Sequence, residues 1–169
     1  MARDDTQTLG FIAAGAGIAL WWVLRRPSPN FSWAELTTTG TGLDNTPTLE
    51  DRIRLILLAR RVLEPMRAAF GPLIVNSAFR SPSVNDAVSG AAASHHLTGT
   101  AADLYSSSGY TNEQIATWLY DQPDLPIAEV VVYPESPTSR IHVAVDVDGA
   151  PGERKFLSYD GGSYTSWSP

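Results

Sequence analysis

The first patterned segment of the chain is an apolar run at residues 9–24, which contains no charged side chain and is followed by Arg25 and Arg26. As a helix, this run would span about 24 Å, somewhat less than the ~30 Å hydrocarbon core of a bilayer. Trp21 and Trp22 favour the membrane interface. The pattern predicts an N-terminal membrane helix, with a helix buried in the domain core as the alternative. A cleaved signal peptide fits poorly, because the residues before the run are Arg-Asp-Asp rather than basic.

Further along the chain, apolar residues recur at helical spacing over residues 49–70, which predicts the longest helix of the domain. Pro65 lies inside this segment and predicts a kink, because proline lacks the N–H that the helix needs. The inward face is predicted to carry Ile53, Ile56, Leu57, Leu63 and Met66.

Two shorter helices are predicted from their capping residues. Ser32 and Glu35 have the spacing of a capping box. Thr111 is placed to cap a helix over residues 111–120, whose inward residues are Ile115, Trp118 and Leu119.

Four short segments have the pattern of strands, at residues 73–75, 129–133, 141–147 and 155–159. The clearest of them, 141–147, alternates apolar residues with others. Helices and strands of this kind predict an α+β fold, with the helices packed on one face of a small antiparallel sheet.

Length and composition fit one domain rather than two. The chain has 169 residues and a formal net charge of -6, which argues against nucleic-acid binding because such proteins present a basic surface. It contains no cysteine, so a metal must be held by histidine and carboxylate ligands. We divide the chain into an anchor and linker at 1–30, a domain at 31–160 and a C-terminal tail at 161–169.

Residues 94–104 are the strongest candidate for chemistry. His96 and Asp103 lie seven positions apart with small residues between them, and Gly99 permits a turn that points both side chains inward. A third candidate ligand, His142, lies in the apolar strand 141–147. Alternation places it on the face opposite Ile141 and Val143. Two imidazoles and one carboxylate leave a fourth position for water, which is the pattern of a catalytic zinc site. Spacing alone leaves open that these histidines are ordinary packed or exposed residues.

Five segments of the chain carry motifs. Residues 94–103 read S-x-H-x-x-G-x-A-x-D; F-S-W-x-E-L at 31–36, D-N-x-P at 44–47 and V-N-S-A-F-R-S-P-x-V-N at 75–85 precede them, and R-I-H-V at 140–143 follows. In this order they resemble the zinc D-Ala-D-Ala carboxypeptidase and L-Ala-D-Glu endopeptidase family, in its small phage-type single-domain branch. The resemblance implies a hedgehog/DD-peptidase fold, with His96, Asp103 and His142 as ligands of Zn²⁺.

The resemblance also implies a role for Arg80, which family members place near the metal. A guanidinium there binds a substrate carboxylate or steadies the oxyanion. Arg140 replaces the aromatic residue that relatives carry before the last Ile/Val-His pair. His95 is expected to be a neighbour on the rim of the site.

One position departs from the family pattern. Many relatives carry an acid three residues before the last histidine as general base, where this chain has Ser139, which cannot do that work. Glu135, seven residues before His142, is the catalytic base that we expect. Asp146, on the same strand face as His142, is the other candidate.

These residues predict a zinc-dependent peptidase that hydrolyses peptidoglycan stem-peptide bonds, phage-derived and held at a membrane by residues 9–24. The rival class is a structural component of a phage virion or envelope, which keeps the fold but little or no activity. Ser139 in place of the usual acid is consistent with this class. Both interpretations place a membrane-anchored protein in a virion or a bacterial cell envelope, with stem peptides or assembly partners as ligands. One arginine before the run and two after it weakly favour a cytoplasmic domain, which leaves the orientation open.

Overall fold

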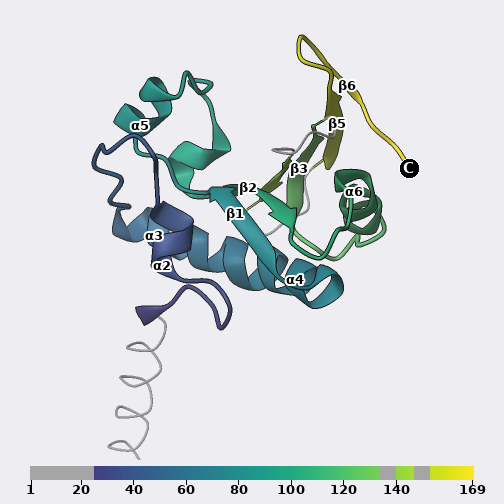
Figure 1. Ribbon diagram of the computed structural model, residues 1–169, viewed down its shortest axis with the longest axis horizontal. Coiled ribbons are helices and arrows are strands. Elements are labelled where there is room, and N and C mark those ends of the chain that lie inside the picture. The colour runs from purple at the N-terminus through teal and green to yellow at the C-terminus, as the bar shows by residue number, and fades with distance from the viewer. Residues whose placement is uncertain (1–24, 134–139, 147–152) are drawn as a thin grey trace, which may run out of the picture.

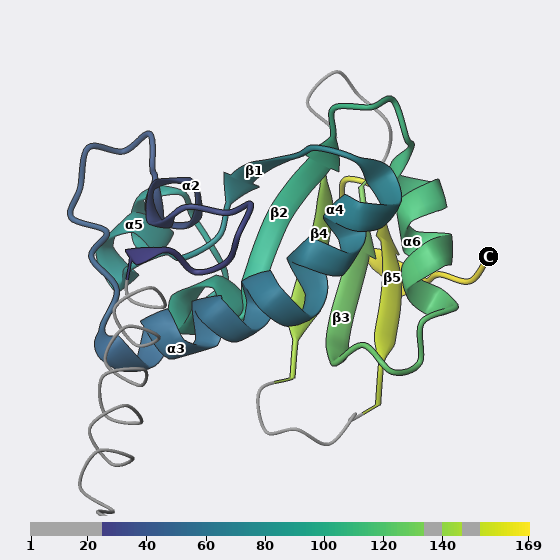
Figure 2. The same cartoon turned by 90° about the horizontal axis from the view of Figure 1, so that it is seen from below.

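The computed structural model describes residues 25–133, 140–146 and 153–169 of the chain. They form a six-stranded sheet with helices packed on it (Figure 1; Figure 2), which confirms the predicted α+β class. The membrane helix predicted at 9–24 lies outside the described residues. Among the residues that are described, no helix is both long and apolar enough to cross a membrane.

The strands of the sheet follow the order β1-β2-β4-β3-β5-β6. All neighbouring strands are antiparallel except β3 and β5, which pair in parallel. The prediction of a small antiparallel sheet was wrong at this pair, because β5 follows β4 in the chain but lies on the far side of β3. The strands are β1 (Leu73–Ser77), β2 (Ala101–Ser106), β3 (Ile127–Val132), β4 (Ile141–Val145), β5 (Lys155–Tyr159) and β6 (Tyr164–Ser166).

Two of these strands were not predicted, because neither has a period-two pattern. Every residue of β2 except Tyr105 is buried, so its sequence does not alternate between apolar and polar residues. Every residue of β6 is exposed, so no apolar face marks it. β6 lies inside the segment that the sequence assigned to the tail at 161–169, and it pairs with β5.

The predicted helix at 49–70 forms as three consecutive elements, α3 (Leu49–Leu58), the π-helical turn η1 (Ala59–Leu63) and α4 (Glu64–Phe70). In the π turn the N–H of Glu64 donates to the carbonyl of Ala59, five residues earlier. Pro65 follows directly, and its missing N–H and bulky ring are incompatible with the regular hydrogen-bond ladder at this point. The predicted irregularity at Pro65 is therefore present, as a widened turn before the proline.

The buried face of this helix differs in part from the predicted one. Ile53 and Leu57 were expected inside, but their exposed fractions are 52% and 39%. The inward prediction was wrong for these two residues because apolar side chains occupy more than one face of α3, so spacing alone does not select the buried stripe. The side chains that are fully buried along the helix are Leu55, Leu58, Ala59, Val62, Leu63 and Met66.

The remaining helices are short. α2 (Trp33–Thr37) begins with the predicted capping box of Ser32 and Glu35. α6 (Asn112–Tyr120) is capped by Thr111 and buries Ile115 and Leu119 as predicted. α5 (Pro82–Ala87) and the 3₁₀ turn η2 (His95–Thr98) fall in the motif segments. Figure 2 shows the α3–α4 helix crossing the sheet, with α6 beside β3 and β5.

Residues that the sequence assigned to the linker contact the domain. The Nε of Arg60 donates to the carbonyl of Pro27 at 2.9 Å. The carboxylate of Glu64 accepts from the backbone N–H and the side-chain amide of Asn30, at 2.8 and 2.7 Å. Phe31, the next residue, is buried in the core. The segment 27–30 is therefore held against the η1–α4 part of the long helix.

Candidate metal centre

The sheet places two of the predicted ligands side by side. Asp103 of β2 is the register partner of His142 of β4, and directly opposed residues on neighbouring strands point to the same face of a sheet. The residues before and after them, Ala102, Leu104, Ile141 and Val143, point to the other face and are fully buried in the core. Alternation along two central strands thus separates the polar site from the apolar core.

The third ligand comes from the turn before β2. His96 lies in η2, which ends at Gly99 with a left-handed φ of 69°. A Cβ at Gly99 would lie 2.9 Å from the backbone oxygen of Asp51, so both the backbone conformation and the space require glycine here. This turn folds His96 back over the start of β2, as the sequence predicted for Gly99.

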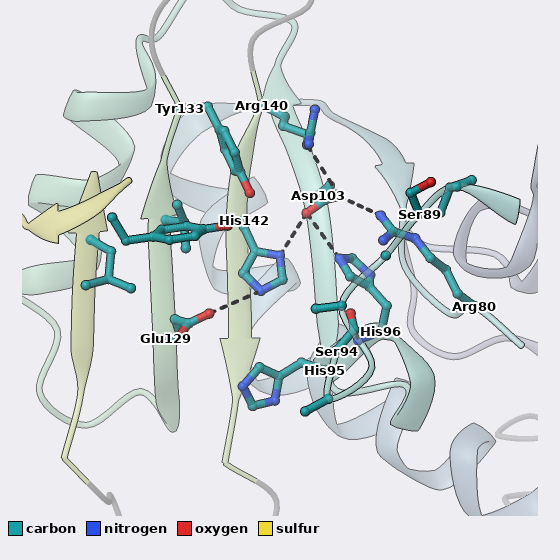
Figure 3. Close-up of a pocket in the computed structure, with 17 residues that line it drawn as sticks. Arg80, Ser89, Ser94, His95, His96, Asp103, Glu129, Tyr133, Arg140 and His142 are labelled. Atoms are coloured by element: carbon teal, nitrogen blue, oxygen red, sulfur yellow. Dashed lines mark hydrogen bonds and ion pairs between the residues drawn. The ribbon is translucent and has the colours of Figure 1, made fainter. Parts of the chain in front are cut away.

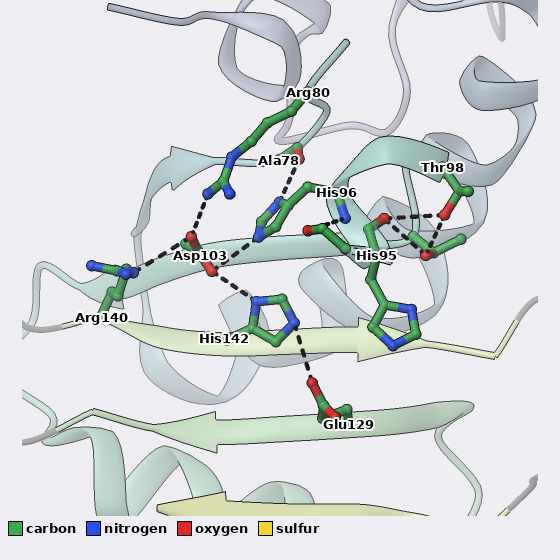
Figure 4. Close-up of polar contacts among 11 residues, drawn as sticks. Ala78, Arg80, His95, His96, Thr98, Asp103, Glu129, Arg140 and His142 are labelled. Carbon is green, nitrogen blue, oxygen red and sulfur yellow. Dashed lines mark hydrogen bonds and ion pairs between the residues drawn. The ribbon is translucent and has the colours of Figure 1, made fainter. Parts of the chain in front are cut away.

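The three predicted ligands converge on one point (Figure 4). The Nε2 of His96 lies 3.2 Å from Oδ1 of Asp103, and the Nδ1 of His142 lies 2.8 Å from the same oxygen. All three side chains are buried, and one ligand atom from each lies within 4.8 Å of the others. The structure therefore assembles the His–Asp–His group that the sequence predicted.

The hydrogen bonds of His96 select the nitrogen that is free to bind a cation. Its Nδ1 lies 2.6 Å from the carbonyl of Ala78, and a carbonyl only accepts, so Nδ1 carries the proton. In a neutral ring Nε2 then has a lone pair, which faces the carboxylate of Asp103, also an acceptor. Two acceptors in contact need a positive charge between them, supplied by a proton or by a metal ion.

The ionisation preferences in the cluster favour the metal over the proton. Burial lowers the pKa of His96 and outweighs the opposite effect of Asp103, so the ring resists protonation. Burial alone would raise the pKa of Asp103, but its close contacts with the rings of His142 and His96 outweigh burial and hold that pKa well below its usual range. A neutral imidazole at His96 and an ionised carboxylate at Asp103 are ligand forms that zinc requires, and His142 offers a second ring nitrogen, so the donor set fits Zn²⁺.

Arg80 lies beside this cluster and is fixed in place by two hydrogen bonds. Its Nη2 donates to Oδ2 of Asp103 at 2.8 Å, and its Nε donates to the hydroxyl of Ser77 at 2.8 Å. Ser77 is the register partner of Asp103 across β1 and β2. The structure therefore brings Arg80 to the metal centre, where it lines the same pocket.

Glu129 is a residue of the site to which the sequence analysis gave no role. It lies on β3, and its Oε1 is 3.9 Å from Nε2 of His142, the ring nitrogen that faces away from Asp103 (Figure 4). This separation exceeds that of a hydrogen bond, so Glu129 contributes its negative charge beside the outer ring nitrogen of His142. The available signal was a lone charged residue in the apolar strand 127–132, which identifies Glu129 only once β3 is known to pair with β4.

Of the two candidates for the catalytic base, only Asp146 lies among the described residues. Glu135 lies outside the described residues, as does Ser139. Asp146 follows β4, and its N–H donates to the carbonyl of Pro126 at 3.0 Å. In the described part of the chain it is not one of the residues that line the pocket over the triad.

The triad lies in an open pocket of about 540 Å³, shown in Figure 3. Tyr133 and Tyr164 line the pocket, and Tyr133 packs edge to face on Tyr159 with ring centroids 5.5 Å apart. Burial, with Tyr164 and Asp103 nearby, raises the pKa of Tyr133 to about 12, so its phenol stays protonated. His95, expected on the rim, is among the lining residues. The other polar members of the lining are Arg80, Ser89, Ser94, Glu129 and Arg140.

A buried His–Asp–His cluster that opens to a pocket, on an α+β domain, has the arrangement of a metal-dependent hydrolase. The model of the family Peptidase M15 matches residues 29–124, more than half of the chain. The chain therefore belongs to the Peptidase M15 family of metallopeptidases. A search of curated proteins finds no match.

Proposed function

We propose that this protein is a zinc peptidase that hydrolyses stem-peptide bonds of peptidoglycan. The observation that carries the proposal is the buried group of His96, Asp103 and His142 at an open pocket. Membership of the Peptidase M15 family supports it, because the family implies a peptidoglycan-type substrate. Zinc bound by such ligands supplies a Lewis acid for a carbonyl and lowers the pKa of a water molecule to about 7.

Three side chains of the protein have separate roles in this reaction. Arg80 is held from behind by Ser77 and Asp103, and it stabilises negative charge on the carbonyl oxygen of the substrate. Glu129 places its negative charge 3.9 Å from the outer ring nitrogen of His142 and so favours this orientation of the ring. Glu135 takes the proton of the attacking water, as its position seven residues before His142 suggests.

The test is digestion of purified peptidoglycan with the zinc-loaded protein, followed by mass spectrometry of the released fragments. We expect products of cleavage within the stem peptide, lost on chelation and recovered when zinc is returned. The masses also identify the bond. If zinc-loaded protein releases nothing from peptidoglycan or from soluble stem peptides, the peptidase proposal is wrong, and the metal serves to stabilise a structural domain of a virion or envelope.

We further propose that residues 9–24 tether the domain to a membrane. The support is the uncharged apolar run itself, which would be a large aggregation-prone surface in water. The full-length protein is expected to require detergent or lipid, whereas a variant that begins at Arg25, and so retains the contacts of Pro27 and Asn30, stays monomeric without it. Size-exclusion chromatography and circular dichroism measure both. A full-length monomer in plain buffer, together with unfolding of the shortened variant, would instead identify the run as a core helix.

A further inference from the structure

Arg140 lies at the edge of the metal centre, just before β4 (Figure 3). Its side chain is 42% exposed, and its guanidinium lies over the ring of Tyr133, 4.5 Å from the centroid. This cation–π contact fixes the plane of the guanidinium at the pocket wall. Arg140 is therefore a pre-oriented cation that faces the space above the triad.

Arg140 is not needed to neutralise the charge of Asp103. Oδ2 of Asp103 already accepts from Arg80 at 2.8 Å, whereas Arg140 approaches the same oxygen only at 3.5 Å and through Nε. That Nε is buried without a hydrogen-bond partner. The terminal nitrogens of Arg140 make no hydrogen bond within the described ranges, so the binding edge of its fork is left for another group.

The charges around the pocket indicate the sign of that group. Two guanidinium groups, Arg80 and Arg140, face two carboxylates, Asp103 and Glu129, among the described lining residues. A divalent metal ion adds two positive charges to this balance, which leaves the pocket strongly cationic. An anionic part of the substrate is needed to compensate, and a planar guanidinium fork pairs best with a carboxylate.

We infer that Arg140 binds a free carboxylate carried on the Cα of the residue whose nitrogen is released by cleavage, an inference that rests on the proposed peptidase function. The two bonds named by the family resemblance both present this group. A terminal D-Ala-D-Ala ends in the carboxylate of its second alanine. In an L-Ala-D-Glu bond the glutamate continues the chain through its γ-carboxyl group, so its α-carboxylate is free. Arg140 selects for this carboxylate, whichever of the two bonds is cut.

The test uses two pairs of substrates: an acyl-D-Ala-D-Ala peptide with its C-terminal amide, and an L-Ala-γ-D-Glu peptide with its α-amide. The pair that is cleaved identifies the source of the carboxylate. In that pair, wild-type protein is expected to prefer the acid over the amide by about tenfold or more in kcat/KM. Arg140→Gln is expected to lose most of this preference, a fall of about tenfold, mainly through KM, as expected for the loss of a charge-assisted hydrogen bond.

Two further variants separate the fork from other effects. Arg140→Lys keeps the charge but loses the planar fork, so it is expected to give an intermediate preference. Arg52→Gln is the matched control, because Arg52 also lies over an aromatic ring, 5.1 Å from the centroid of Trp33, yet is not part of the pocket lining. It is expected to keep the wild-type preference. The zinc content of each variant is measured alongside.

Binding to metal-free protein gives a second readout that does not need turnover. The two acids and their amides are titrated into ¹⁵N-labelled protein, and the acid is expected to bind more tightly to wild type but not to Arg140→Gln. Equal cleavage of acid and amide by wild type would leave the peptidase intact and overturn the role of Arg140. If neither pair is cleaved, the proposed function fails, and the titration decides: equal binding of acid and amide overturns the inference, and tighter binding of the acid supports it.

Discussion

The Asp103→Ala variant is expected to hold less than about a tenth of an equivalent of zinc, against about one per chain in the wild type. Asp103 is the centre of the site, because the ring nitrogens of His96 and His142 both face its Oδ1. Its removal leaves two imidazoles without the carboxylate, and a structural or catalytic zinc site needs at least three protein ligands. Metal analysis of the purified variant by plasma mass spectrometry measures this directly, and hydrolysis is expected to be lost with the metal.

The histidines provide the matched comparison. His96→Ala and His142→Ala are expected to lose zinc to the same extent, whereas His95→Ala is expected to retain it, because His95 lines the pocket but does not belong to the triad. Circular dichroism confirms that each variant is folded. Folded wild-type protein that takes up less than about a tenth of an equivalent, without any chelator, would end the zinc hypothesis.

The second large effect is expected for Glu135→Gln, which should slow hydrolysis by about 10²- to 10⁴-fold, the usual contribution of a general base. Glutamine has nearly the same shape as glutamate but cannot take a proton from water. Zinc content should stay at about one per chain, because Glu135 is proposed as a base and not as a ligand. Steady-state kinetics on a soluble stem peptide, with metal analysis of the same sample, checks both statements.

Two other acids serve as controls for this assignment. Glu129→Gln is expected to weaken zinc binding by about 10- to 100-fold, the usual cost of losing a partner of a metal-binding histidine. Asp146→Asn is expected to change little, since Asp146 is not among the described residues of the pocket wall. If Asp146→Asn abolishes hydrolysis while Glu135→Gln leaves it unchanged, Asp146 is the base and the assignment of Glu135 is wrong.

The three residues of the His–Asp–His group could be predicted because each lies in a segment that resembles a motif of the family. His96 and Asp103 belong to one short motif with a glycine between them, and the left-handed backbone of Gly99 follows from that residue type. His142 lies in a strand whose alternation gives it a face. Glu129 has no such signal, since its proximity to His142 depends on which strand pairs with β4. Strand pairing is a long-range property that no local pattern encodes.

The same contrast between local and long-range features explains which parts of the fold could be predicted. The capping box of Ser32 and the N-cap at Thr111 involve residues three positions apart, and both were predicted correctly. The parallel pairing of β3 with β5 and the exposed strand β6 depend on the path of the chain between strands, which a short window of sequence does not contain. The buried side of α3 was likewise decided by the partners of that helix, because several of its faces are apolar.

The attachment of residues 27–30 to the long helix limits how the catalytic domain could move on a tether. Pro27 and Asn30 are bonded to Arg60 and Glu64, and Phe31 is anchored in the core. A segment that precedes residue 27 is therefore joined to the domain at a fixed point rather than through a flexible linker. If residues 9–24 lie in a bilayer, the pocket would reach only those peptides that lie within about one domain diameter of the lipid surface, some tens of ångströms. Cell-wall strands near the membrane would then be within reach, and more distant layers would not.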